Sequence, residues 1–230
     1  MNPEKIQSDL FKSFYFLSHG FLTRALGNQQ AAGIAVKKVC RLKQVHSNRV
    51  VVIPNEVRDL SRYKKEEADA MVTKLKGIAL TIVTADCIPL LFCDPSKKII
   101  AAAHAGWRGT SANVARMTVQ KMIEWGSDPK NIFVALGPSV QKCCYEVDRR
   151  VYDAPFFGEH KNLFEPVSGK KGHWRVSLPH VNREQLKEGG VLKEHIWISP
   201  LCTACLGEDF YSYRREGEKA GRQWSYVALM

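Results

Sequence analysis

The sequence predicts an α+β fold in one domain that spans residues 1–230. Predicted strands outnumber predicted helices, and the two kinds of element do not alternate as they would around a parallel sheet wound with helices. A chain of 230 residues with 45% hydrophobic residues is also long enough to bury about 70% of its unfolded surface. Because no repeat or low-complexity linker divides the chain, we expect a single core.

Strands are expected where β-branched and aliphatic residues run between turn residues. The run Arg49–Ile53 ends at Pro54, and the run Ile78–Thr84 follows Gly77. The other expected strands are Pro89–Cys93, Ile99–Ala103, Ile132–Leu136, Ile196–Ile198 and a final pair at Phe210–Arg214 and Gln223–Ala228.

Two helices are expected from apolar residues that recur at helical spacing. The first covers Ser111–Trp125, with Thr110 or Ser111 as its cap and Gly126 as its end. The second begins near Pro179 and ends at a pair of glycines that follows Lys187. Residues 155–172, which are rich in glycine and proline, are expected to form a long mobile loop.

The charge favours anionic partners. With 34 Lys and Arg against 23 Asp and Glu, the net charge is +11, which suits anionic substrates, phosphate or nucleic acid. The basic residues form only short scattered clusters and no nucleic-acid motif is present, so we do not expect a nucleic-acid partner. No stretch approaches the ~20 apolar residues of a membrane helix, so we expect no membrane partner.

Cysteine usage indicates a reducing compartment. The seven cysteines are an odd number, and the adjacent pair Cys143 and Cys144 has poor geometry for a disulfide framework. The N-terminus lacks the apolar core of a signal peptide. We therefore expect a cytoplasmic protein, as a monomer or small homo-oligomer.

Cys87 and His104 flank a predicted hairpin. If the chain folds about Pro95 and Ser96, the register sets Cys87 directly opposite His104. Opposed residues have Cβ atoms about 5 Å apart on one face, so a thiolate and an imidazole could reach one metal ion. That donor pair suits zinc or copper. The alternative is a buried core cysteine beside a hydrogen-bonded histidine.

Six segments occur in a fixed order and together resemble one family. They are Lys43–His46, Ala68–Thr73, Thr84–Pro89, Ala103–Gly109, Gly137–Ser139 with Cys143–Val147, and Tyr211–Arg215. Over residues 20–229 the chain resembles the laccase-domain family, also called YfiH-type or peptidoglycan editing factor proteins. The resemblance implies a layered α/β/β/α sandwich with mixed sheets.

The same resemblance implies a metal site and an activity. The metal ligands it implies are His46, Cys87 and His104. The activity it implies is a purine nucleoside phosphorylase acting on adenosine, inosine and methylthioadenosine, with adenosine deaminase activity, in proteins formerly labelled polyphenol oxidases. The cofactor would be zinc, with copper possible, and the partners would be purine nucleosides with inorganic phosphate as co-substrate.

The chemistry fits those residue types. Two histidines and one cysteine leave a fourth zinc position open, as in a catalytic site, where zinc lowers the pKa of water enough for attack on C6 of a purine. Phosphorolysis needs cations for phosphate, and arginine binds phosphate oxygens in pairs. Arg108 ranks first for this role, ahead of Arg214 and Arg215, whose alternative is ordinary surface charge.

Asp86 adjoins Cys87 and Asp69 is a second carboxylate candidate, although both could also be simple turn caps. We assign catalysis to Cys87, His104, Arg108 and Asp86, and substrate binding to Gln44, Asp69, Arg108, Cys144, Tyr145 and Arg214. Adjacent side chains of an extended segment point to opposite faces, so at most one of Cys143 and Cys144 would line the site. The CxxC spacing of Cys202 and Cys205 suggests redox chemistry or a second zinc, but no second CxxC or nearby histidine completes such a site.

Three other functions stay open. A cysteine hydrolase acting on a cell-wall precursor would use Cys87 as nucleophile and His104 as base. A copper-dependent phenol oxidase needs many histidines, and seven without an HxH pair are too few. A binding module without enzymatic activity would depend on the basic charge alone.

Overall fold

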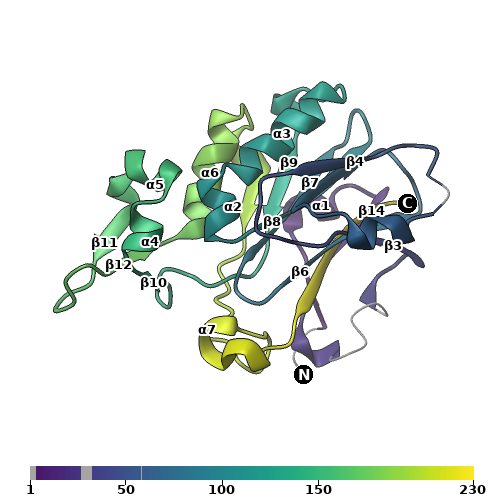
Figure 1. Cartoon of the computed structure of the whole chain (residues 1–230). Helices are drawn as coiled ribbons and strands as arrows, with labels where there is room; N and C mark the ends of the chain where they lie inside the picture. The colour runs from purple at the N-terminus through teal and green to yellow at the C-terminus, as the bar shows by residue number, and fades with distance from the viewer. Residues whose placement is uncertain (1–3, 27–32, 58) are drawn as a thin grey trace.

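The computed structural model describes residues 4–26, 33–57 and 59–230, and two of its sheets pack face to face. The larger sheet has six strands in the order β13-β9-β7-β8-β5-β4, and its partner has five in the order β1-β2-β14-β6-β3. Figure 1 shows helices α2, α3 and α6 on one side of the six-stranded sheet and strands β6 and β14 on the other. The expected layered α+β class is confirmed.

The strands have the following bounds. The six-stranded sheet contains β4 (Val50–Ile53), β5 (Ala70–Thr73), β7 (Ile88–Asp94), β8 (Ile99–Ala105), β9 (Phe133–Leu136) and β13 (Ile196–Ile198). The five-stranded sheet contains β1 (Lys5–Ile6), β2 (Leu17–Leu22), β3 (Lys38–Arg41), β6 (Ile78–Thr84) and β14 (Gln223–Leu229). A small antiparallel sheet contains β10 (Glu146–Val147), β11 (Phe164–Pro166) and β12 (Trp174–Val176).

The helices are mostly short. They are α1 (Asp9–Lys12), α2 (Trp107–Ser111), α3 (Val114–Glu124), α4 (Arg149–Tyr152), α5 (Pro155–Glu159), α6 (Leu178–Glu188) and α7 (Tyr213–Glu216). Single 3-10 turns are η2 (Ser61–Lys65), η3 (Pro129–Asn131), η4 (Lys161–Leu163), η5 (Lys193–His195) and η6 (Gly217–Lys219). Among the described residues, no helix combines the length and apolar character needed to cross a membrane.

Strand β7 shows why the core has two layers. Leu90 and Phe92 point to the helical side, whereas Leu91 and Cys93 point into the space between the two sheets. This alternation follows from the two-residue period of a strand. All seven residues of β7 are buried, so the strand is apolar on both faces, and that continuous run makes it easy to recognise in the sequence.

The outer face of the five-stranded sheet has a thinner cover. Tyr226 and Ala228 pack there against Leu22 and Ile34, with Leu26 at the edge of the cluster. Within the described ranges, this face is covered by apolar side chains from the segment before β3. The helical face of the six-stranded sheet is covered instead by α3 and α6.

The β7–β8 register differs by two residues from the expected one. Pro89, not Cys87, lies opposite His104. The turn is longer than a fold about Pro95 and Ser96, because Lys98 adopts the left-handed conformation (φ 52°) and the Asp94 carboxylate accepts the backbone N–H of Ser96 at 2.9 Å. A shift of two residues keeps every side chain on its face, so Cys87 and His104 still share one side of the hairpin.

The helix expected over Ser111–Trp125 is shorter in the structure, where it is α3, and Ser111 belongs to the separate helix α2. Helix α2 ends at Ser111, and α3 starts only after Asn113, which is left-handed (φ 63°). Neither Thr110 nor Ser111 is therefore the cap of the longer helix, although Gly126 ends it as expected, with φ 101°.

Two other expectations are wrong. Residues 210–214 form no strand: their chain enters the short helix α7, where Ser212 Oγ accepts the backbone N–H of Arg215 at 3.2 Å. Residues 155–172 are not one long loop, because they contain α5, η4 and β11. Phe157 and Phe164 from this segment are buried against the helical side of the core, which explains why it is ordered.

Candidate functional site

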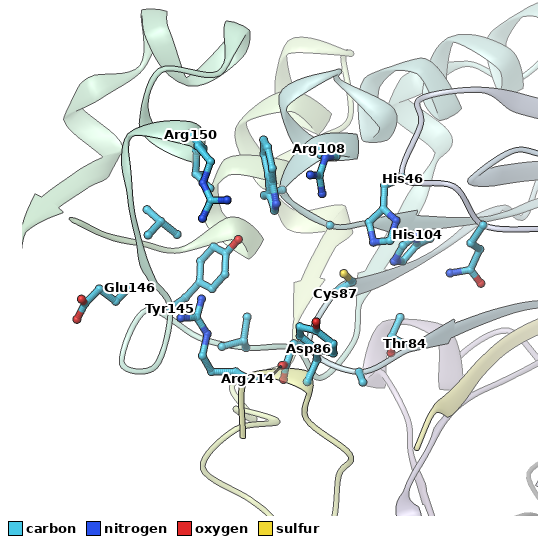
Figure 2. Close-up of a pocket in the computed structure, with 18 of the residues that line it drawn as sticks. His46, Thr84, Asp86, Cys87, His104, Arg108, Tyr145, Glu146, Arg150 and Arg214 are labelled. Carbon is cyan, nitrogen blue, oxygen red and sulfur yellow. Dashed lines mark hydrogen bonds between the residues drawn. The ribbon is translucent and has the colours of Figure 1, made fainter. Parts of the chain in front are cut away.

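Three side chains of the kinds that ligate metals meet at the ends of strands in the six-stranded sheet. The ligand atoms of His46, Cys87 and His104 all lie within 4.8 Å of one another. His46 comes from the β3–β4 connection, Cys87 from the β6–β7 connection and His104 from the end of β8. Figure 2 shows the three side chains converging at one end of a pocket.

The backbone is strained at one of these three residues and at the neighbour of another. His46 and Asp86 have φ of 61° and 85°, a region that costs a non-glycine residue about 1 kcal/mol or more. Around His46 the strain is offset by Asp69, whose carboxylate accepts the backbone N–H groups of Val45, His46 and Ser47 at 3.1, 3.0 and 2.6 Å. The loop is therefore held in the conformation that presents its imidazole.

The same carboxylate fixes the second histidine. Asp69 is fully buried, and its Oδ1 lies 2.8 Å from His104 Nδ1. Burial opposes ionisation of this carboxyl, but hydrogen bonds from His104 and Ser47 outweigh it and lower its pKa to about 2. With Nδ1 bonded to Asp69, His104 presents Nε2 to the site, which is the usual carboxylate–histidine–metal arrangement.

Cys87 and His104 also ionise each other. Burial favours the neutral thiol, but the charge of His104 and hydrogen bonds from both histidines outweigh it and lower the pKa of Cys87 to about 6. For His104, burial is outweighed by Cys87 and Asp69, which raise its pKa to about 9. Without metal, the pair is therefore a thiolate and an imidazolium at neutral pH, and the thiolate is the form that binds metals.

Gly106 leaves room for the ligands. A Cβ atom at this position would lie 2.9 Å from Cys87 Sγ and 3.0 Å from His46 Cδ2. Its φ and ψ of −79° and 179° are open to any residue, so glycine is needed here for space and not for backbone freedom.

The donor set fits a metal with an open position. Zinc takes nitrogen at about 2.0 Å and sulfur at about 2.3 Å, and three protein ligands leave the fourth position to water or substrate. Copper accepts the same nitrogen and sulfur donors. His46, Cys87 and His104 are thus the residues that would hold a catalytic metal.

The metal cluster opens into a cavity of about 890 Å³. Its wall includes Arg108, Tyr145 and Arg214 (Figure 2). The two arginines could bind an anion, and the aromatic ring of Tyr145 could pack against a base. The Arg108 guanidinium lies 4.4 Å from the Trp107 ring centre, and that of Arg214 lies 5.3 Å from the Tyr145 ring centre. Within the described part of the chain, neither guanidinium has a carboxylate partner, so both are free to bind an anion.

Asp86 lines the cavity, but both of its carboxylate oxygens are used in hydrogen bonds to other segments of the chain. Its Oδ1 accepts the Thr203 hydroxyl at 2.6 Å, and its Oδ2 accepts the Ser212 hydroxyl at 3.1 Å and the Arg214 backbone N–H at 2.6 Å. Both oxygens are therefore used to join three segments of the chain.

The other expected site residues divide into two groups. Tyr145 and Gln44 line the cavity, but the Gln44 amide is bonded to the backbone of Val83 at 2.8 and 2.9 Å. Burial, with the nearby Cys87 thiolate, raises the pKa of Tyr145, so its phenol keeps its proton. Asp69 lies behind the ligands, outside the cavity lining, and Cys144 lies with three other cysteines.

Some pocket residues were missed in the sequence. Trp107 lies within the same motif as His104 and Arg108 and could have been included on that ground. Arg150 also lines the cavity, paired with Asp148 at 2.8 Å, but nothing in its sequence setting distinguishes it from surface arginines. All seven cysteines are free thiols in the structure.

The fold and the site together define a class, namely α+β proteins in which a Cys/His cluster able to hold a metal opens onto a cavity lined by arginines. A family model described as multi-copper polyphenol oxidoreductase laccase matches residues 24–230. The chain belongs to this family. A structure titled as that of the hypothetical protein YfiH of Bacillus licheniformis superposes with a TM-score of 0.86 and 27% identity, covering 99% of this chain and 97% of the other.

Relatives in this family are named as purine enzymes. A purine nucleoside phosphorylase of Deinococcus radiodurans is 38% identical over 86% of this chain and 73% of its own length. A protein from an unknown prokaryotic organism, named an adenosine deaminase, is 36% identical over 85% of this chain and 76% of its own. A mouse purine nucleoside phosphorylase is 35% identical over 90% of this chain, which spans 46% of the mouse protein.

Proposed function

We propose that the chain is a zinc-dependent purine nucleoside phosphorylase acting on adenosine, inosine and methylthioadenosine, with adenosine deaminase activity. The observation that carries this is the open His46–Cys87–His104 cluster facing two unpaired guanidinium groups, those of Arg108 and Arg214, across one cavity. The names of the relatives supply the substrate class.

In phosphorolysis, inorganic phosphate attacks C1′ of the ribose, and the purine leaves with the electrons of the glycosidic bond and takes up the proton that hydrogen phosphate gives up. Arg108 and Arg214 bind the phosphate oxygens, since guanidinium groups pair with them bidentately. Tyr145 keeps its proton and donates a hydrogen bond to the substrate. The products are the free base and ribose 1-phosphate.

In deamination, water adds at C6 of adenosine and ammonia leaves, which gives inosine. When bound, zinc supplies Lewis-acid chemistry and makes water easier to ionise near neutral pH. The chain's contribution is to orient the ligands through Asp69 and to shape the cavity through Asp86. Phosphate is needed for the first reaction and not for the second.

The test is to incubate zinc-loaded protein with adenosine, with and without phosphate, and to separate the products by chromatography. Adenine and ribose 1-phosphate should form only with phosphate, whereas inosine should form under both conditions. Absence of both free base and inosine from metal-loaded protein would refute the proposal.

Two arginine variants separate the reactions. Arg108→Gln removes a phosphate ligand, so phosphorolysis should fall by at least roughly tenfold, equal to about 1.4 kcal/mol, while deamination changes less. Arg116→Gln is the matched control, because Arg116 is exposed on α3 and lies outside the cavity lining. Equal losses of both activities in Arg108→Gln would remove Arg108 from the phosphate site.

A cysteine hydrolase acting on a cell-wall precursor is the second candidate. It is favoured by the chain of contacts from Asp69 through His104 to Cys87 and by the lowered pKa of the Cys87 thiol, which are the features of an activated nucleophile. Trapping of Cys87 by an amide-directed electrophile during turnover by metal-free protein would support this candidate. Stoichiometric zinc bound through Cys87 in the active protein would exclude it.

A further inference from the structure

A second group of side chains with metal-ligand atoms lies outside the cavity lining. The Sγ atoms of Cys143, Cys144, Cys202 and Cys205 all lie within 4.8 Å of one another. Cys143 Sγ is 3.7 Å from both Cys144 Sγ and Cys205 Sγ, and Cys144 Sγ is 3.3 Å from Cys205 Sγ. We call these four residues the four-cysteine cluster.

The chain brings the cluster together through two loops. Residues 141–144 form a turn, in which Gln141 O accepts the backbone N–H groups of Cys144 and Tyr145 at 2.9 and 3.0 Å. In a turn, neighbouring side chains need not point to opposite faces as they do in a strand. Cys143 and Cys144 therefore reach the same point, contrary to the expectation of an extended segment.

The second loop supplies the CxxC pair. Ser139 forms a parallel bridge with Cys202, and Thr203 donates its backbone N–H to Ser139 O at 3.1 Å. Cys202 is buried and its Sγ accepts the backbone N–H of Gln141 at 3.4 Å. This hydrogen bond fixes the position of the Cys202 sulfur, so the sulfur is already oriented for metal binding.

We propose that the four-cysteine cluster binds one zinc ion in a closed structural site. Tetrahedral zinc with bonds of about 2.3 Å to sulfur places its sulfurs about 3.8 Å apart. The three separations among Cys143, Cys144 and Cys205 are 3.3 to 3.7 Å, and Cys202 Sγ lies within 4.8 Å of each of them. A disulfide would need about 2.05 Å. Binding releases four thiol protons and leaves a complex of charge −2, with no redox step.

One cation, Arg215, lies against the CxxC loop, and it is also paired with Glu216. Arg215 donates two hydrogen bonds of 2.9 Å, to Thr203 O and Ala204 O, within the CxxC loop. The whole chain has a net charge of +11, so a complex of charge −2 enters a favourable field. Soft thiolate donors without oxygen ligands select zinc over magnesium or calcium.

The ion would hold the wall of the cavity. Tyr145 directly follows Cys144 and lines the cavity, and Thr203, between Cys202 and Cys205, donates to Asp86. One ion would therefore fix both loops beside Cys87 without touching the substrate. This inference does not depend on the proposed nucleoside chemistry.

The test counts metal in three proteins after reconstitution with zinc, by elemental analysis. The wild-type protein should bind two equivalents per chain, His46→Ala one, and the double variant Cys143→Ser with Cys205→Ser one. Cys143 and Cys205 are exposed, so serine there should not prevent folding. Cys40→Ala, a buried thiol of neither cluster, is the control and should keep two equivalents.

Cobalt reconstitution of His46→Ala identifies the ligands independently of the serine variant. Its spectrum should show the charge-transfer absorption of four cobalt–thiolate bonds, whereas the Cys87 site offers one. Loss of all metal from His46→Ala, or a disulfide between cluster cysteines in protein purified without reductant, would overturn the proposal. Absence of nucleoside activity from zinc-loaded wild-type protein, with the four-thiolate spectrum retained in His46→Ala, would count only against the proposed function.

Discussion

The His46–Cys87–His104 cluster and the four-cysteine cluster both gather side chains of the kinds that bind metals, but the chain holds them in different settings. The first has imidazole ligands, a buried carboxylate behind them and a cavity in front. The second contains sulfur alone and joins two loops at the surface. If both clusters bind zinc as proposed, the first would be an open site for chemistry and the second a closed site for structure.

The ionisation of the thiols follows the same division. His104 supplies a cation within the first cluster, and it lowers the pKa of Cys87 against the effect of burial. In the second cluster, burial and hydrogen bonds from neighbouring thiols raise the pKa of Cys143 and Cys144. Only the pKa of Cys202 is lowered, because hydrogen bonds from backbone N–H groups outweigh the effect of burial. The second cluster thus lacks an internal cation, and a metal ion would provide one.

The largest effect is expected for Cys87→Ala. This variant removes one of three ligands, so the rates of both nucleoside reactions should fall by at least about 100-fold. That loss exceeds the 10–100-fold typical when a residue that hydrogen-bonds to a ligand is replaced. Zinc content should fall by one equivalent while the four-cysteine cluster keeps its metal. Activity near that of wild type in Cys87→Ala would show that the first cluster is not the catalytic one. Cys40→Ala is the control for the loss of a thiol.

The next effect is expected for Asp69→Asn. The amide keeps the shape but loses the charge that orients His104, so metal affinity at the first cluster should fall about 10–100-fold. A competition titration with a zinc chelator measures this. Unchanged affinity would mean that the histidine is held by packing alone.

Acid titration gives a second measurement on the same variant. Folding lowers the pKa of Asp69 from 3.8 to about 2, so its contribution to stability is complete above pH about 4 and is lost as the pH falls through about 2. Asp69→Asn should lack this loss. Parallel acid unfolding of the two proteins would contradict the assignment.

The sequence predicted the first cluster better than the second for a physical reason. Cys87 and His104 lie at the ends of two adjacent buried strands, and a register error of two residues preserves their face. The four-cysteine cluster joins segments about 60 residues apart through a turn and an isolated bridge. Neither contact leaves a periodic pattern in the sequence.

The fold shows the same limit. Buried strands such as β6 and β7 are continuous apolar runs and were found almost to the residue. Strand β2 was missed because its sequence includes Ser18, His19 and Gly20, which fit no simple apolar or alternating pattern. Residues 210–214 looked like a strand because of their aromatics, but the polar groups of Ser212 and Arg214 are bound by Asp86, a partner distant in sequence.

Thiol alkylation of metal-free protein sharpens the contrast in ionisation. With a pKa of about 6, Cys87 is about nine-tenths thiolate at pH 7, whereas the raised pKa of Cys143 leaves it a thiol. After allowing for the weaker nucleophilicity of a low-pKa thiolate, Cys87 should react roughly tenfold faster. Peptide mass spectrometry over a pH series measures both rates, and faster reaction at Cys143 would reverse the comparison.

A smaller effect is expected for Gly106→Ala. The added Cβ would meet Cys87 Sγ at 2.9 Å, so the ligand must move by a few tenths of an ångström, and metal affinity at the first cluster should fall about fivefold, or about 1 kcal/mol. The thermal midpoint of metal-free protein should barely change, because the backbone conformation suits alanine. An equal fall in affinity at the four-cysteine cluster would show a general loss of structure.

The smallest effect on activity is expected for Cys205→Ser. The variant removes one sulfur of the closed site, whose connection to the cavity runs from Thr203 to Asp86 and from Cys144 to Tyr145. Because none of these steps touches the reacting atoms, kcat should fall only about twofold, or about 0.4 kcal/mol. Hydrogen exchange around residues 139–145 and 200–206 should rise in parallel, since the ion no longer joins the loops. A fall in kcat as large as that of Cys87→Ala would place the four-cysteine cluster within the catalytic machinery, whereas unchanged exchange would deny it a structural role.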